Sequence, residues 1–149
     1  MSTHFSVSVH CLLLLSLSAP ERITSAEIAG SVNTNPVVVR RILGGLKKAG
    51  LVNSSPGTRG FYLAKPASEI TLAMVYEAAK DEGPLFPIHG SCNPNCEVGM
   101  QMDGLLTNLY QIAESKVEQF FATITLEDME RTSTERIQAP QLEANQKSN

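Results

Sequence analysis

Residues 24–50 read TSAEIAGSVNTNPVVVRRILGGLKKAG, and this stretch decides the predicted fold. Thr24 is a good N-cap residue, and Glu27 three positions later completes a capping box. The pair therefore predicts that a short helix begins after Thr24 and covers residues 25–32.

A second helix follows after a turn at residues 33–35. Asn35 is predicted to cap it, and Pro36 suits its first position, where the missing N–H is not needed. Gly50 is a well-placed left-handed terminator, so the helix is expected to end near Ala49. Two short helices joined by a tight turn are typical of a helix-turn-helix.

The flanking sequence extends this unit into a winged helix-turn-helix. An apolar run predicts a first helix over about residues 2–17, and two short β signals at 51–54 and 60–64 flank a Pro- and Gly-containing hairpin tip. A further helix is expected over about 69–80. The predicted fold class is therefore mainly α with a small β-hairpin wing, followed by a long C-terminal dimerisation helix.

Four regions are predicted along the chain. The DNA-binding domain covers residues 1–80. A loop rich in Gly and Pro covers 81–99, and its length is typical of functional or disordered loops. A dimerisation helix region covers 100–130, and the polar, weakly patterned residues 131–149 are expected to form a disordered tail.

The charges divide unequally between the two halves of the chain. Up to Pro66 there are seven Lys or Arg and two Glu, a net charge of +5, whereas the remainder has five basic and thirteen acidic residues, a net charge of −8. The basic half is expected to face phosphate. Aromatic residues are only 5% of the chain, which argues against binding by base stacking and favours double-stranded DNA as the partner.

The predicted third helix carries the residues best suited to read DNA. Arg40 and Arg41 lie in its first half, and an arginine fork matches guanine O6 and N7. Lys47 and Lys48 suit phosphate, and Arg59 at the hairpin tip suits a narrow minor groove. The candidate DNA-binding residues are Ser25, Asn35, Val37, Val38, Arg40, Arg41, Lys47, Lys48, Arg59 and Gly60.

Most of residues 1 to 125 resemble the Rrf2 family of winged helix-turn-helix transcriptional regulators, and in particular its YwnA-like branch. The resemblance is carried by SAEIA at 25–29, NPVVVRRIL at 35–43, LKKAGLV at 46–52, RGFYLAKP at 59–66 and EITL at 69–72. It implies a homodimer that binds a pseudo-palindromic operator, in most members as a repressor.

The long helix is implied to pair with its twin across the dimer axis. Apolar residues at three- and four-residue spacing support this independently, although such a stripe can also pack on its own domain. The candidate dimer-interface residues are Met102, Leu106, Leu109, Ala113, Val117, Phe120 and Ile124.

The loop cysteines leave three interpretations open. Cluster-binding members of the family carry three cysteines in this loop, whereas this chain has Cys92 and Cys96, with His89 nearby. An iron–sulfur cluster normally has four protein ligands, so these three residues fall short. They are interpreted as a vestigial loop, a reversible thiol switch, or a metal or cluster site. Cys11 is expected to be a small buried hydrophobe.

Two rival functions compete with DNA binding. A winged helix can also dock proteins, and Val37 and Val38 give that alternative some support. A thiol enzyme using Cys92 or Cys96 with His89 would need a rigid frame that this loop does not offer, so no enzyme activity and no small-molecule substrate are predicted. No basic residue precedes the short apolar run near the N-terminus, so neither a secretory signal nor a membrane span is expected, and the protein is predicted to be cytoplasmic.

Overall fold

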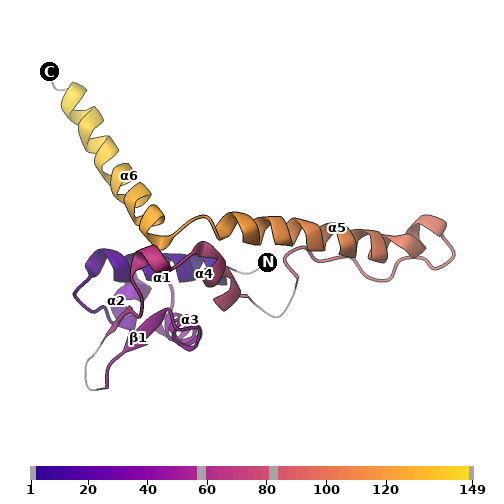
Figure 1. The fold of residues 1–149 in the computed structure, drawn as a ribbon, viewed down its shortest axis with the longest axis horizontal. Helices are drawn as coiled ribbons and strands as arrows, with labels where there is room; N and C mark the ends of the chain where they lie inside the picture. Colours follow the sequence, from indigo (N-terminus) through magenta and orange to yellow (C-terminus); the bar gives the residue numbers. More distant parts are fainter. Residues whose placement is uncertain (1–2, 57–59, 81–83, 148–149) are drawn as a thin grey trace.

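The computed structural model describes residues 3–56, 60–80 and 84–147. These residues form a mainly helical chain with one two-stranded antiparallel sheet, as Figure 1 shows. The predicted fold class, a winged helix-turn-helix with a long C-terminal helix, is confirmed. The elements are α1 (His4–Ser18), α2 (Ser25–Val32), α3 (Pro36–Lys48), β1 (Val52–Ser54), β2 (Phe61–Leu63), the 3-10 helix η1 (Ala67–Glu69), α4 (Leu72–Ala78), α5 (Glu97–Phe121) and α6 (Leu126–Lys147).

Helix α1 is the centre of the N-terminal core. Cys11, Leu12 and Leu15 are almost fully buried, and Leu13 and Leu14 pack partly against the same core. Three- and four-residue spacing in the sequence would place Phe5, Val9, Leu12, Leu13 and Ser16 on one face, but only Leu12 of these five is buried. Because α1 contacts α2, α3, α4, α6 and β2, it buries side chains on several sides and the core centres on Cys11 instead.

The helix-turn-helix forms as its local signals predict. The Thr24 hydroxyl accepts a hydrogen bond from the Glu27 amide at 3.2 Å, and the Glu27 carboxylate accepts one from the Thr24 amide at 2.8 Å. The Asn35 side chain accepts from the Val37 amide at 2.8 Å and caps α3. Gly50 follows with φ +78°, a conformation that suits glycine.

The hairpin is short and is joined to the start of α2. Strand pairing sets Val52 opposite Leu63, and Ile23 adds an isolated bridge to Phe61. Gly60 has φ +148°, and a Cβ there would lie 2.8 Å from the Cβ of Arg22, so only glycine fits. The tip at residues 57–59, including Arg59, lies outside the described residues.

The C-terminal half differs from the prediction in its boundaries. Helix α5 begins at Glu97 rather than after residue 99, so the preceding loop is shorter than expected. A separate helix, α6, covers much of the predicted disordered tail. Thr125 and Asp128 form a reciprocal capping box at its start, and Leu126 is fully buried. The sequence therefore contains a local helix-start signal and one core residue that the polar composition of the segment conceals.

Helix α5 extends as a long arm, and α6 leaves the domain on the side away from α3 (Figure 1). The arm is tied to the N-terminal core by a cluster of Phe5, Tyr76 and Phe121, with ring centroids 5.1–5.9 Å apart. Across the described parts of the chain, no helix is both long and apolar enough to cross a membrane.

Candidate nucleic-acid interface

Helix α3 has one apolar face and one cationic face. Val39, Ile42, Leu43 and Leu46 are buried in the core. The opposite face is exposed and contains no acidic residue. It carries Val37, Arg40, Arg41, Gly44, Lys47 and Lys48, which we call the cationic face of α3.

Arg40 is oriented by the start of α2. Its Nε donates a hydrogen bond to Ser25 Oγ at 3.2 Å, which brings two candidate DNA-binding residues together across the helix-turn-helix. Both side chains remain accessible from solvent. The contact holds the guanidinium near the N-terminus of α2, whose amides favour phosphate.

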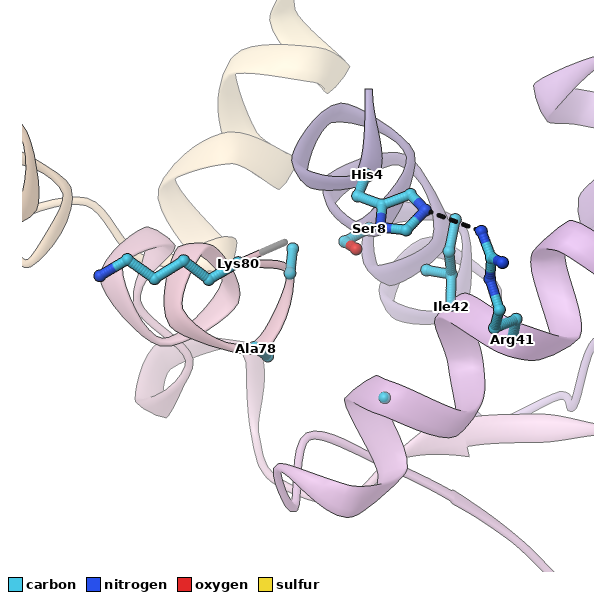
Figure 2. Close-up of a pocket in the computed structure, with 8 residues that line it drawn as sticks. His4, Ser8, Arg41, Ile42, Ala78 and Lys80 are labelled. Atoms are coloured by element: carbon cyan, nitrogen blue, oxygen red, sulfur yellow. Dashed lines mark hydrogen bonds between the residues drawn. The ribbon is translucent and has the colours of Figure 1, made fainter. Parts of the chain in front are cut away.

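Arg41 is oriented toward α1 instead. Its Nη2 lies 3.3 Å from His4 Nε2, and Figure 2 shows this contact at the edge of a pocket between α1, α3 and the end of α4. The pocket has a volume of about 120 Å³. Because an arginine can only donate, His4 Nε2 is the acceptor in this contact. Arg41 would have to leave His4 to reach deep into a groove.

Lys47 and Lys48 lie at the end of the same face. Lys47 Nζ donates to Ser54 Oγ at the end of β1 at 3.0 Å, so it links α3 to the part of the hairpin that leads into the tip. Lys48 is exposed on the adjoining part of the helix. The two ammonium groups extend the cationic face toward the wing.

Arg22 is a basic residue at the wing that the sequence analysis did not single out. Its guanidinium carbon lies 4.4 Å from the centroid of the Tyr62 ring, a cation–π geometry, and the side chain is exposed. The signal that places it there is the bridge between Ile23 and Phe61, which joins residues far apart in sequence.

Three of the candidate DNA-binding residues have structural roles in the fold itself. Asn35 caps α3 through its side chain, and Val38 is partly buried against the core. Gly60 makes room for Arg22. Val37, in contrast, is 64% exposed and has no comparable structural role. A contact of any of these residues with DNA stays a prediction.

No residue of α5 is buried, and its apolar residues form a stripe along one face of the helix. Val98, Met102, Leu105, Leu109 and Ile112 follow one another at spacings of four and three residues, and Phe120 continues the same face. Leu109 is 56% and Ile112 53% exposed. We call these six residues the outer stripe of α5.

The predicted interface residues divide between this stripe and its border. Met102, Leu109 and Phe120 lie on the outer stripe. The other four are half-buried along the neighbouring edge or just after the helix: Leu106, Ala113, Val117 and Ile124. Tyr110, Glu114 and Phe121 point to the chain's own side, where they contact Phe86, Tyr76 and Phe5.

A charged junction joins the arm to α4. Lys80 Nζ lies 3.1 Å from Glu118, 3.4 Å from Glu77 and 3.5 Å from Glu114. The hydrogen bond to Glu118, together with the attraction of the Glu77 and Glu118 carboxylates, holds the pKa of Lys80 above its ordinary value. Tyr76 donates to Glu114 at 3.1 Å, and burial together with this bond raises the pKa of its hydroxyl.

Comparison with known proteins decides the family. The chain matches the Rrf2 family model, described as an iron-dependent transcriptional regulator, over residues 1–132. The chain belongs to the Rrf2 family. The resemblance found in the sequence is thereby confirmed.

The Rrf2 assignment agrees with individual relatives. YwnA of Bacillus subtilis (strain 168), named as a candidate HTH-type transcriptional regulator, is 36% identical over 129 residues, or 87% of this chain and 96% of YwnA. A solved structure of a candidate DNA-binding protein is 35% identical, with a TM-score of 0.69, and the match covers 85% of this chain and 97% of that one. IscR of T. potens, at 18% identity, shares the fold with a TM-score of 0.67 over 89% of this chain and 87% of its own.

The Rrf2 description raises the question of iron, and the loop residues do not fit a cluster within one chain. Cys92 Sγ lies 3.4 Å from His89 Nε2, whereas Cys96 is exposed at the N-cap of α5. Among the described residues no group of three or more His, Cys, Asp and Glu is arranged to hold a metal ion. A cluster normally needs four ligands. A redox or metal-sensing role for these residues stays a prediction.

Proposed function

We propose that this Rrf2-family chain is a sequence-specific regulator of transcription that binds double-stranded DNA through the cationic face of α3. The supporting observation is that four cations lie on the exposed side of one helix that contains no acid, while the opposite side is buried in the core. An α-helix fits the major groove, where each base pair presents a distinct pattern of donors and acceptors.

The residues around α3 would divide the work of binding. Arg40 and Arg41 are placed to read base edges, and Lys47 and Lys48 are placed for the phosphates that flank the groove. Ser25, at the start of α2, would orient Arg40 and contact the backbone. The wing, with Arg22 against Tyr62 of β2 and Arg59 expected at the tip from the sequence, would follow the adjacent minor groove.

The functional unit we propose is a homodimer paired through α5. The outer stripe consists of five exposed apolar side chains and the half-buried Met102, along one face over most of a 25-residue helix. A second copy of the same stripe is its proposed occupant, because a long heptad-like face is self-complementary across a twofold axis. Two α3 helices related by that axis would read a pseudo-palindromic operator. Occupying promoter DNA in this way would repress transcription.

The proposal is tested by a mobility-shift assay on duplexes that the protein selects from a pool with a randomised core. Wild type should prefer the selected duplex to random DNA, and its affinity should fall steeply with salt. Arg40→Ala should remove the preference at one base pair of each half-site, a loss of about 1–3 kcal/mol per good arginine–guanine pair.

A matched cation on another element provides the control. Arg136 is exposed on α6, and Arg136→Ala should leave selection and affinity unchanged. If wild type selects no sequence, the result contradicts specific DNA binding. It then favours the rival role as a protein-docking winged helix, with the exposed Val37 in the docking surface.

A further inference from the structure

Gly44 lies at the centre of the cationic face of α3. Arg40 and Arg41 precede it by four and three residues, and Lys47 and Lys48 follow it by three and four. Since residues three and four apart are neighbours on a helix surface, all four cations of α3 surround this one position. Gly44 itself is exposed.

Within the part of the chain that the structure describes, no contact requires a glycine at this position. A Cβ built on Gly44 would meet no heavy atom within 4 Å, and its φ is not positive. Glycine in a helix interior is less stable than alanine, because it loses more conformational freedom on folding. Glycine at this position therefore makes α3 less stable than alanine would, in the middle of its cationic face.

Gly60 and Gly99 differ from Gly44 in this respect. Gly30 in α2 and Gly104 in α5 also have open space around a built Cβ, but no Lys or Arg lies three or four residues from either of them. A Cβ on Gly60 would lie 2.8 Å from the Cβ of Arg22, and one on Gly99 would lie 2.9 Å from the carbonyl oxygen of Asn93. Those two positions are fixed by close contacts within the fold. Gly44 has no such contact, so any requirement for a missing side chain must come from outside the chain.

We infer that Gly44 is the point where the backbone of α3 approaches the floor of the DNA major groove most closely. This inference rests on the proposed function and adds a specificity-determining residue to it. Without a side chain at its centre, the helix can lie deeper, so that the arginines reach base edges while the lysines reach the phosphates. A methyl group at Gly44 would hold all four cations away from the duplex at once.

Gly45 provides a matched control in the same helix. It is also exposed, but its direction around the helix is about 100° from that of Gly44, toward α4. A Cβ there would lie 3.9 Å from the carbonyl oxygen of Ala78, an ordinary contact. Gly44→Ala and Gly45→Ala therefore make the same chemical change on the binding side and on the side facing α4.

The experiment compares wild type with both variants on the duplex that wild type selects and on a scrambled duplex of equal length. Both variants should melt about 2–4 °C higher than wild type, because each replaces a poor helix former by the best one. Gly44→Ala should bind the selected duplex about tenfold more weakly, and Gly44→Leu more weakly still. Gly45→Ala should bind it like wild type.

Each remaining outcome contradicts a defined part of the argument. Wild-type selectivity with an equally tight Gly44→Ala would overturn the inference and leave the proposed function intact. Equal losses in both alanine variants would assign the effect to a stiffer helix and overturn it as well. An absence of selection by wild type would remove the proposed function, and the role of Gly44 with it.

Discussion

Arg40 and Arg41 are consecutive in sequence, yet each is held by a different helix before DNA is present. Arg40 contacts Ser25 on α2, and Arg41 contacts His4 on α1. Because successive residues of a helix point about 100° apart, the two guanidinium groups leave α3 on either side of Gly44. The contacts give Arg40 a fixed direction from the start, whereas Arg41 must exchange its partner to reach a base.

The three cysteines are expected to differ in reactivity for reasons that lie at single residues. Cys11 is fully buried, and burial raises the pKa of its thiol to about 11, so it stays protonated at neutral pH. Cys92 and Cys96 are accessible. Brief treatment of the native protein with iodoacetamide should therefore alkylate Cys92 and Cys96 and spare Cys11, as measured by peptide mass spectrometry.

Denatured protein provides the control for this alkylation, because all three thiols should then react. Labelling of Cys11 in the native state at the rate of the loop cysteines would mean that the core opens around α1 far more often than its packing indicates.

At the scale of elements, the sequence predicted those whose ends are marked locally. The capping box at Thr24, Pro36 at the first position of α3 and Gly50 after its end give the bounds of α2 and α3 within one or two residues. The apolar period of α3 also indicated which of its side chains face outward. These signals lie within one turn of the elements that they define, so no tertiary knowledge was required.

The missed features depend on residues that are distant in sequence. The Arg41–His4 contact joins positions 37 residues apart, and Arg22 meets Tyr62 only because the hairpin folds back on the α1–α2 connection. The buried side of α1 could not be read from periodicity, because its leucine run is apolar around most of the helix. Helix α6 is stabilised by Leu126 and by contacts with α1 and η1, which a polar composition does not reveal.

The capping box of α6 gives a prediction at this scale. Thr125→Ala removes the hydroxyl that accepts from the Asp128 amide, and loss of such a cap lowers stability by about 0.5–2 kcal/mol. The measurement is urea unfolding followed by circular dichroism. Thr132→Ala is the control: the Thr132 hydroxyl bonds back to a carbonyl within α6, so its removal should leave stability equal or higher.

The partner of Thr125 in the box adds a pH dependence to the same test. Hydrogen bonds from Thr125, and then Arg131, lower the pKa of Asp128 below its ordinary value of 3.8. The stabilisation is therefore complete above that value and is lost as the pH falls through the lower folded-state pKa. Asp128→Asn should lower the urea midpoint more than Glu127→Gln at pH 7, and the difference should vanish in acid. A difference that persists there would contradict the role of the carboxylate.

At the scale of the whole molecule, the surfaces proposed for DNA binding and for dimer pairing lie on different parts of the chain. The basic residues are concentrated before Pro66, and the acidic ones lie mainly on the segments that carry α4, α5 and α6. In Figure 1 the arm and α6 extend away from α3. A duplex along α3 would thus meet the positive half, while the acidic half stays remote from phosphate.

The outer stripe of α5 gives the prediction for assembly. Leu109→Glu together with Ile112→Glu places charge in the middle of the proposed seam, and the protein should become monomeric by analytical ultracentrifugation. Gln111→Glu is the control, because Gln111 is exposed on a different face of the same helix. A monomer should bind the selected duplex much more weakly, because the binding free energies of two linked half-sites no longer combine in one complex. A double variant that stays dimeric would show that the dimer interface does not run through the outer stripe of α5.

The junction at Lys80 is expected to set the spacing between the two DNA-reading helices. Lys80 is surrounded by Glu77, Glu114 and Glu118 where α4 meets the arm, so Lys80→Gln leaves three carboxylates that repel one another and should loosen that joint. Inserting one base pair between half-sites rotates one of them by about a tenth of a turn. Wild type should lose affinity for the lengthened duplex, whereas Lys80→Gln should bind both spacings almost equally. Lys80→Arg, which keeps the charge, should restore the wild-type preference. If all three proteins show the same preference, the angle of the arm is fixed by the aromatic cluster of Phe5, Tyr76 and Phe121 without help from the ion pairs.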